Sequence, residues 1–406
     1  MHPIIAALRY HKTAVILLAL EIALTCAIVT NAIYIISDHA AGMRVVTGVA
    51  DNELIWAMSS GLRDNATAAS AVSLQSADLA ALRGMPGVKS AVVMNAVPLG
   101  NREWRGSVFT TPGDSPALQD VVTYVGNKGV VGTLGLTVTQ GRDFLPQDYV
   151  DYDPFKGKTN PPPAAIITRA LAERLWPGQN ALGKPMFFGE KGQLATHVVG
   201  IVAHLLNPSM TNYRNAELNV LLPVKSVNGG IYVVRVEAGS RDVTLRHLSD
   251  VLDRVDDQRI ITESHRFADT IRDYFHDDRA LIWLLVVVIG CLLALTALGV
   301  VGLSSFWVQQ RTRQIGIRRA IGATRRDIVV YFQLENLLIV GIGIAVGSIG
   351  AVMLNLVLMA HYELPRLPLP YLSIGALALL ALGQLAVLGP ALRAAAVPPV
   401  VATRSV

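Results

Sequence analysis

The sequence predicts an α-helical membrane protein with four transmembrane helices and a large mixed α/β domain inserted between the first and second helix. Hydrophobic residues make up 52% of the 406 residues and charged residues only 16%, which is too apolar for an ordinary soluble globule. Four apolar runs occupy residues 13–36, 281–308, 337–360 and 370–392. Each run is long enough to supply the roughly 20 helical residues that cross a hydrocarbon core. The block between the first two runs is large enough to bury a core of its own.

The first element, residues 1–36, is expected to be a short cytoplasmic N-terminus followed by the first span. Arg9 and Lys12 precede its apolar run, as in a secretory signal peptide. The run is longer than the roughly 7–15 apolar residues of a signal sequence, so we expect an uncleaved anchor.

Charge predicts the orientation of the spans. Residues 311–327 hold six arginines and one acid between two apolar runs, and short loops of this kind stay in the cytoplasm. Residues 37–279 contain 24 Lys and Arg against 26 Asp and Glu, whereas the whole chain has a net charge of +5. The positive charge therefore follows topology and gives no indication of nucleic-acid binding. Both termini, including Arg393 and Arg404 in the tail, are expected inside, and the block 37–279 outside.

The remaining membrane elements follow in order from this orientation. We expect a second span at 280–308, a cytoplasmic segment at 309–328, a third span at 329–360, an outer loop at 361–369 containing Glu363, a fourth span at 370–392 and a cytoplasmic tail at 393–406. Within the third span, Gly343, Gly347 and Ala351 recur at four-residue spacing and predict a face for close helix packing.

The exported block reads as alternating strands and helices. Residues 53–58, 88–97, 231–237 and 259–262 have strand character, and 76–83 and 241–254 have helical spacing. Two strand–helix–strand units at the ends of the block predict two α/β halves, in a ferredoxin-like arrangement, around an insertion at about 129–207. The block has no cysteine, and Cys26 and Cys291 lie in spans, so no disulfide is expected.

One segment imitates a phosphate-binding loop. Residues 178–184 match its first seven positions, but Pro185 stands where a Ser or Thr must hold magnesium. We therefore expect a turn between a helix at 170–175 and a strand at 186–188. No catalytic motif and no clustered metal ligands occur, so we expect no catalytic residue, no metal and no cofactor on this chain.

The arginine-rich segment predicts a contact with another protein. Apolar side chains interrupt its arginines, which favours a short helix lying against a partner, with arginines paired to the partner's acids and glycines allowing close approach. Anchoring of the arginines at anionic lipid headgroups is the alternative. The candidate contact residues are Arg313, Ile315, Gly316, Ile317, Arg318, Arg319, Ala320, Ile321, Gly322 and Ala323.

Two acids near or within the spans complete the candidate sites. Glu335 stands at the start of the third span, where we expect a hydrogen bond or ion pair to the arginine segment. Glu21 lies about a third of the way along the first apolar run, where an isolated charge is costly. It is expected to face a neighbouring helix or to be protonated, and an interfacial carboxylate without a functional role remains the alternative.

The segment Gln-Arg-Thr-Arg-Gln-Ile-Gly-Ile-Arg-Arg-Ala-Ile-Gly-Ala-Thr-Arg-Arg-Asp-Ile at 310–328, followed by Gln-Leu-Glu at 333–335, resembles the signature of FtsX-like, MacB-type permeases. The end of the chain, 390–402, is similar to the closing segment of that family. Residues 134–144, 172–178, 182–184 and 198–202 resemble the MacB-type periplasmic core domain.

The resemblance implies a type VII ABC transporter permease in the inner membrane, with four spans and a periplasmic domain between the first two. In this family two permeases, identical or related, work with two ATPases that bind ATP and Mg, and ATP-driven motion is transmitted to the periplasmic side. Only twelve residues precede the first span, whereas MacB carries its ATPase at the N-terminus, so we expect a separate ATPase. A periplasmic adaptor or substrate protein is a further expected partner. The alternative is a membrane-anchored sensor or scaffold that binds a ligand or regulates a cell-wall enzyme.

Overall fold

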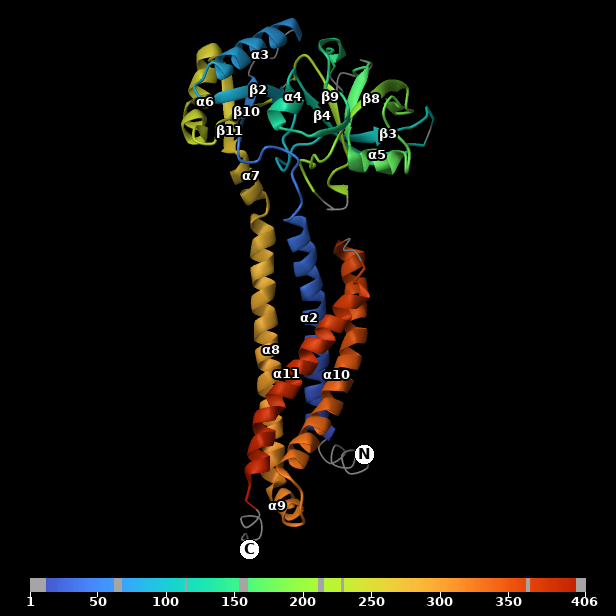
Figure 1. Cartoon of the computed structure of the whole chain (residues 1–406), viewed down its shortest axis with the longest axis vertical. Coiled ribbons are helices and arrows are strands. Elements are labelled where there is room, and N and C mark those ends of the chain that lie inside the picture. Colours follow the sequence, from blue (N-terminus) through green and yellow to red (C-terminus); the bar gives the residue numbers. More distant parts are fainter. Residues whose placement is uncertain are drawn as a thin grey trace. The chain divides into compact units, whose positions relative to one another are not determined.

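The computed structural model describes residues 12–61, 68–113, 115–152, 160–210, 215–227, 230–362 and 366–398. Arg9, Glu363 and Arg404 lie outside these ranges. The chain divides into two compact units, one of residues Arg44–His276 and one that joins Met1–Met43 to Asp277–Val406. We describe the two units separately (Figure 1).

The helical unit contains four long apolar helices. They are α2 (Lys12–Gly42), α8 (His276–Gln310), α10 (Arg325–Tyr362) and α11 (Leu369–Ala396), and a short helix, α9 (Thr312–Ala320), joins α8 to α10. In the described part of the chain, four helices are long and apolar enough to cross a membrane. The predicted class, four spans with an α/β domain between the first and second, is confirmed.

Small residues let α10 pack closely against α2, as the spacing of glycines predicted. A Cβ atom added at Gly343 would lie 2.7 Å from Cγ2 of Ile22, and one added at Gly347 would lie 2.6 Å from the carbonyl oxygen of Ala23. One turn further along α10, the Asn31 amide donates to the carbonyl oxygen of Ala351 at 3.0 Å. Such interhelical hydrogen bonds fix the register of helices that have no hydrophobic driving force to associate in lipid.

In the described residues of the α/β unit, eleven strands form one sheet with the path β11-β1-β10-β2-β4-β9-β6-β8-β5, and β3 and β7 pair with β4 and β8 beside this path. The first four are β1 (Leu54–Gly61), β2 (Val88–Met94), β10 (Ile231–Val236) and β11 (Arg259–Arg266), all antiparallel to their neighbours. Helices α3 (Ala68–Arg83) and α6 (Arg241–Val255) contribute to a single core with these strands. The two predicted strand–helix–strand units are therefore present, and they interleave in ferredoxin-like order.

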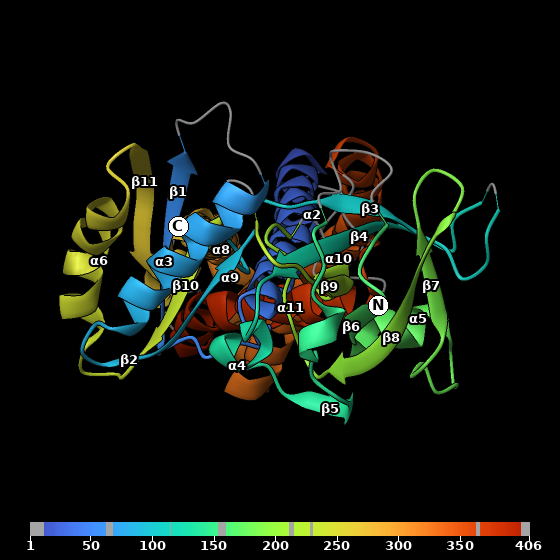
Figure 2. The same cartoon turned by 90° about the horizontal axis from the view of Figure 1, so that it is seen from above.

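The other part of the sheet lies in the chain between β2 and β10. It extends past both ends of the insertion expected at 129–207, because β3 and β4 precede residue 129 and β9 follows residue 207. It contains β3 (Arg105–Val108), β4 (Leu118–Gly126), β5 (Val138–Gly141), β6 (Ala164–Thr168), β7 (Pro185–Phe188), β8 (Leu194–Val202) and β9 (Asn219–Pro223). Helices α4 (Val130–Leu134), α5 (Arg169–Leu175) and α7 (Phe267–Tyr274) and the 3-10 turn η1 (Pro146–Asp148) complete the unit. The two parts join where Met94 of β2 pairs with Gly126 of β4. Figure 2 shows the unit from above, with β11, β1, β10 and β2 to the left and the strands of the other part to the right.

The segment that imitates a phosphate loop is a turn between α5 and β7, as expected from Pro185. Gly178 and Gly183 adopt φ angles of +68° and +76°, which glycine accepts without the steric cost paid by other residues. The backbone of Gly183 donates to the carbonyl oxygen of Val198 at 2.8 Å, so the turn is fastened to β8.

Candidate functional site

Helix α9 is a short, well-bounded element at the junction of α8 and α10. After α9, Gly322 adopts a φ of +112°, a backbone conformation that L side chains rarely adopt. Thr324 and Asp327 then form a capping box at the start of α10. The Asp327 carboxylate accepts from the backbone N–H of Thr324 at 2.9 Å, and the Thr324 hydroxyl accepts from that of Asp327 at 3.2 Å. These two signals separate α9 from α10 and fix the turn between them.

One face of α9 is packed into the helical unit. Ile315 is 5% exposed and Gly316 is also buried. Ile315 shares a small core with two residues of α10 and three alanines of α11, namely Ile328, Phe332, Ala391, Ala394 and Ala395. Gly316 is likewise covered by neighbouring residues of this chain, and its predicted contact with a partner stays a prediction.

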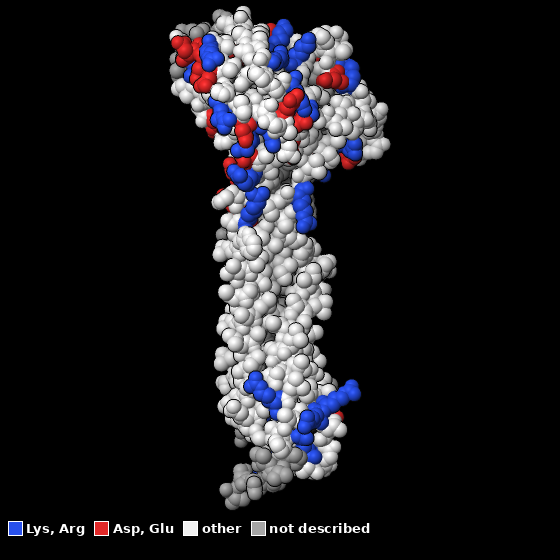
Figure 3. Space-filling view, turned by 60° about the vertical axis from the view of Figure 1, so that its left-hand side comes forward, with Lys and Arg blue, Asp and Glu red and all other residues white. Residues whose placement is uncertain are grey.

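The opposite face of α9 and the following turn are open to solvent. Ile317 is 46% exposed and Ile321 is 82% exposed, while Arg313, Arg318, Ala320 and Gly322 are exposed as well. The guanidinium of Arg318 lies over the ring of Tyr331 at 4.9 Å, which holds this cation in place. Figure 3 shows Lys and Arg gathered toward this end of the helical unit, beyond a long stretch without charged side chains. Exposed apolar side chains and cations, of which Arg318 is held by stacking, are thus presented together.

Two polar contacts fasten α9 to the neighbouring helices. Arg311, directly before α9, donates to both carboxylate oxygens of Glu335 at 3.0 and 2.8 Å, and the Glu335 side chain is 2% exposed. Arg319 donates to the carbonyl oxygen of Val397 at the end of α11. The ion pair expected for Glu335 is therefore present, with Arg311 as its partner.

The ten candidate residues divide into three groups in the structure. Ile315 and Gly316 face inward, Arg319 and Ala323 are half-buried, and the other six are exposed. Our sequence reasoning missed Arg311, Tyr331 and Phe332, which hold the segment in place. The pairing of an arginine at the end of one span with an acid at the start of the next was the available signal for Arg311. No sequence signal indicated the stacking of Tyr331.

Glu21 faces α8, as expected for a carboxyl group inside an apolar span. A Cβ atom added at Gly299 of α8 would lie 2.9 Å from Oε2 of Glu21. Oε1 of Glu21 is buried and has no hydrogen-bond partner among the described residues. One turn along α2, the hydroxyls of Thr25 and Thr296 hydrogen-bond at 3.0 Å. Glu21 therefore lies where α2 meets α8, one turn from a pair of hydroxyls that joins these helices.

The chain is similar in sequence to a family of permeases and to individual transport proteins. Residues 286–399 match the family model "FtsX-like permease C-terminal". The chain is 25% identical over 292 residues to the macrolide export ATP-binding/permease protein MacB of Shewanella sp. (strain ANA-3), covering 66% of this chain and 42% of that protein. It is 27% identical over 258 residues to MacB 2 of Yersinia pestis bv. Antiqua (strain Antiqua), covering 58% of this chain and 35% of that protein.

Solved structures of exported domains are also similar. The periplasmic region of MacB from Actinobacillus actinomycetemcomitans matches with 14% identity and a TM-score of 0.35, covering 58% of this chain and 98% of that one. The extracellular domain of the transporter YknZ from Gram-positive bacteria matches with 18% identity and a TM-score of 0.33, covering 51% of this chain and 100% of that one.

The chain spans less than half the length of the curated MacB proteins reported above. Its match to the family model covers α8 from residue 286 onward, α9, α10 and α11, and its similarity to MacB extends over 66% of the chain. Residues 286–399 of the chain thus match the FtsX-like permease C-terminal family model, and the chain is similar in sequence to MacB proteins.

Proposed function

We propose that this chain is the permease subunit of an ABC transporter of the MacB/FtsX type, and that it couples ATP hydrolysis on a separate ATPase to conformational change in its α/β domain. In this proposal ATP and Mg bind the partner ATPase, and this chain has no catalytic role. The chain lies in the inner membrane with both termini and α9 cytoplasmic, and the α/β domain is periplasmic. A second permease, identical or related, completes the complex, and a periplasmic adaptor or substrate protein can join it.

The observation that carries the proposal is the two-sided construction of α9. A mechanical coupler needs an exposed surface for the ATPase and a rigid attachment to the spans. Ile317 and Ile321 supply exposed apolar side chains next to Arg313 and Arg318, and aromatic stacking fixes Arg318. Buried apolar residues with polar neighbours at their edge are the usual anatomy of a protein interface. Lipid anchoring alone does not call for this fixed arrangement.

The attachment of α9 supports transmission of movement. Ile315 lies in a core with the ends of α10 and α11, and the Arg311–Glu335 pair is largely shielded from water. A displacement of α9 by the ATPase would therefore move these helix ends together, because packed cores do not deform continuously. At the ends of α2 and α8 that lie away from α9, a 2.7 Å contact between Nδ1 of His39 and Oδ1 of Asp278 joins these two helices. These are the two helices whose chains continue into the α/β domain.

The test uses Ile321, because its side chain is 82% exposed and its replacement should leave the permease folded. Burying an isoleucine against a partner contributes about 1.5–3 kcal/mol, so Ile321→Asp should weaken ATPase binding by about tenfold or more. Co-purification of the ATPase and its rate of ATP turnover are measured at equal permease expression. Val243→Asp is the matched control, since Val243 is 52% exposed on α6 in the other unit.

Three outcomes are informative. Loss of the ATPase with Ile321→Asp but not with Val243→Asp supports coupling through α9. Equal retention by both variants contradicts it. Purification of the full chain with a cell-wall enzyme or a sensor protein and without any ATPase would favour the membrane-anchored scaffold instead.

A further inference from the structure

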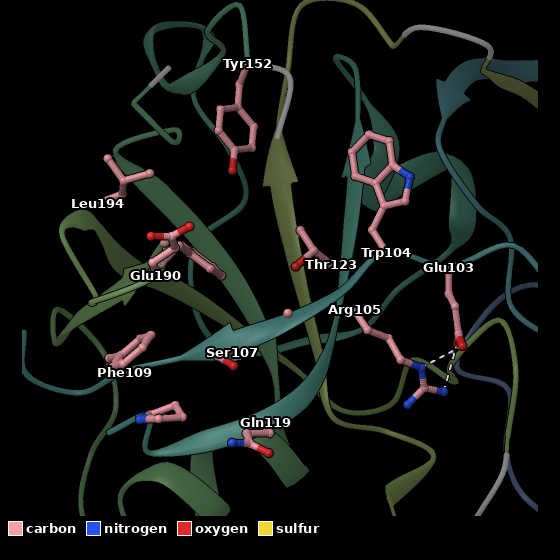
Figure 4. A pocket seen from close by; sticks show the side chains of 14 residues that line it. Glu103, Trp104, Arg105, Ser107, Phe109, Gln119, Thr123, Tyr152, Glu190 and Leu194 are labelled. Carbon is pink, nitrogen blue, oxygen red and sulfur yellow. Dashed lines mark hydrogen bonds and ion pairs between the residues drawn. The ribbon is translucent and has the colours of Figure 1, made fainter. Parts of the chain in front are cut away.

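A groove in the α/β unit lies beside β3, away from all residues considered above. Its volume is about 770 Å³, within the range of roughly 300–1,000 Å³ typical of ligand sites. Figure 4 shows its walls, which come from β3, from β4, from Tyr152 and from the turn between β7 and β8. The lining combines aromatic rings with polar side chains and includes Trp104, Tyr152, Phe109, Phe188, Gln119 and Thr123.

Among the described residues, β3 has no strand paired with Arg105 and Ser107 on the side away from β4. β3 lies off the main path of the sheet and pairs with β4, with Arg105 opposite Val122 and Gly106 opposite Val121. In an antiparallel pair, successive residues point their N–H and C=O groups alternately toward and away from the partner strand. The Trp104 carbonyl accepts from Thr123 of β4, so Trp104 and Gly106 face β4. The backbone groups of Arg105 and Ser107 therefore face away from β4.

The pairing of Phe109 with β7 confirms that the backbone groups of these alternate residues face away from β4. Phe109, two residues beyond Ser107, exchanges two backbone hydrogen bonds of 2.9 Å each with Phe187 of β7. This ladder stops after one pair because β7 ends at Phe188 and the chain turns at Gly189, where φ is +88°. The groove occupies the space beside Arg105 and Ser107 that a continued strand would fill. Unpaired strand edges of this kind are templates for adding an extended chain.

The charges on the walls indicate what such a chain carries. The positive charge of Arg105 is already paired, since its guanidinium donates to Glu103 at 2.6 and 3.0 Å and to the carbonyl oxygen of Ser209 at 3.0 Å. The Glu190 carboxylate, on the β7–β8 turn, is exposed and pairs with no described residue. The groove thus has one uncompensated negative charge beside apolar rings.

We propose that this groove binds an extended peptide segment that contains a basic residue, adding it as a strand along the edge of β3. The backbone of Arg105 and Ser107 supplies the hydrogen bonds, the aromatic rings contact apolar side chains, and Glu190 pairs with the basic side chain. The free backbone edge favours a peptide over a small cationic molecule, which would use the rings and the carboxylate alone. This site is independent of α9, so its failure would leave the proposed coupling role untouched.

The experiment uses the full chain in lipid nanodiscs and a fluorescein-labelled peptide that alternates valine and threonine around one central lysine. Binding is followed by fluorescence anisotropy at low ionic strength, where exposed charge pairs are least screened. Glu190→Lys should weaken binding about fivefold or more, because an attraction becomes a repulsion. Glu173→Lys makes the same change of net charge at an exposed position outside the groove and should leave binding unchanged.

A second arm tests strand addition itself. Methylation of two alternate backbone nitrogens of the peptide removes two donors, and at about 0.5–1.5 kcal/mol for each bond it should weaken binding about tenfold. The unmodified peptide should slow amide hydrogen exchange at Arg105 and Ser107. Undetectable peptide binding, equal effects of the two Glu→Lys variants, or an unaffected methylated peptide would each overturn the proposal. Binding of the aromatic cation rhodamine 6G that depends on Glu190, without peptide binding, would make the groove a small-molecule site instead.

Discussion

Removal of Asp78 should strongly destabilise the α/β unit. Asp78 on α3 is 0% exposed and accepts from both Nη atoms of Arg259 at 2.9 and 2.7 Å. Tyr232 of β10 donates to the same carboxylate, and burial together with this carboxylate raises the pKa of Tyr232 well above its usual value. The Arg259 side chain is only 3% exposed, so Asp78→Ala leaves a buried guanidinium without its counter-charge. Breaking such a buried pair costs about 3–5 kcal/mol.

The expected change in melting temperature follows from the size of the unit. For about 150–250 residues, each kcal/mol shifts the melting temperature by about 2–4 °C, so Asp78→Ala should lower it by about 6–20 °C. The assay is thermal unfolding of the detergent-solubilised chain followed by tryptophan fluorescence. Asp151→Ala is the control, since Asp151 and its partner Lys225 are 57% and 52% exposed and a surface pair contributes at most about 1 kcal/mol.

Equal melting temperatures for Asp78→Ala and Asp151→Ala would refute this reasoning about burial. A second check replaces both partners, as Asp78→Leu with Arg259→Met. Apolar residues in place of a buried ion pair are often neutral or stabilising, so the double variant should be more stable than Asp78→Ala.

Three further predictions concern helix packing, acid stability and topology. Gly347→Leu should destabilise the helical unit by about 1–3 kcal/mol or more, measured by unfolding in detergent, because its side chain would collide with the backbone of α2. Burial raises the pKa of Asp148, but hydrogen bonds from Arg142 and from a backbone N–H outweigh it and hold this pKa below its usual value. The contribution of this pair is therefore present above about pH 4 and is lost as the pH falls through the lowered pKa, so the difference in melting temperature between wild type and Arg142→Ala should shrink below about pH 4. Single cysteines at Ser226 and Thr324, in a background without native cysteines, should react in intact cells with an impermeant maleimide at Ser226 and not at Thr324.

Each of these has a control or a contrary result. Gly341→Leu adds the same volume on α10 at a position with nothing within 4 Å, so equal losses from the two leucines would contradict the packing argument. A constant difference between wild type and Arg142→Ala from pH 7 to pH 3 would show that the pair does not titrate as described. Labelling of Thr324 alone would reverse the proposed orientation.

The membrane part was the easier one to predict from sequence. Four long apolar runs identify spans because lipid offers no partner for backbone groups, so an apolar run of that length must be helical. The ion pair of Glu335 was predictable because it joins the adjoining ends of consecutive spans. The buried position of Gly316 was not predictable, because the sequence of a short helix with apolar residues on several sides does not show which side packs inward.

The α/β unit shows more clearly which structural features local sequence patterns cannot predict. Its two strand–helix–strand units were recognisable from local periodicity, because alternation and helical spacing are properties of neighbouring residues. The extent of the second part of the sheet was not recognisable from local periodicity, because strands such as β4 and β9 pair although a long stretch of chain separates them. The Asp78–Arg259 pair joins residues 181 positions apart. No local pattern marks these two residues as partners.

The sequence by itself determined the number of spans, the place of the α/β domain between the first two, and the arginine-rich segment as a candidate contact with a partner. These follow from hydropathy, length and local spacing, which act through nearest neighbours and solvent. Only the tertiary structure decided which face of α9 is free, that Glu21 meets Gly299, and that the edge of β3 opens onto a groove. Each of these depends on how elements distant in the chain pack together, and packing is set by side-chain shapes that meet only in the folded molecule.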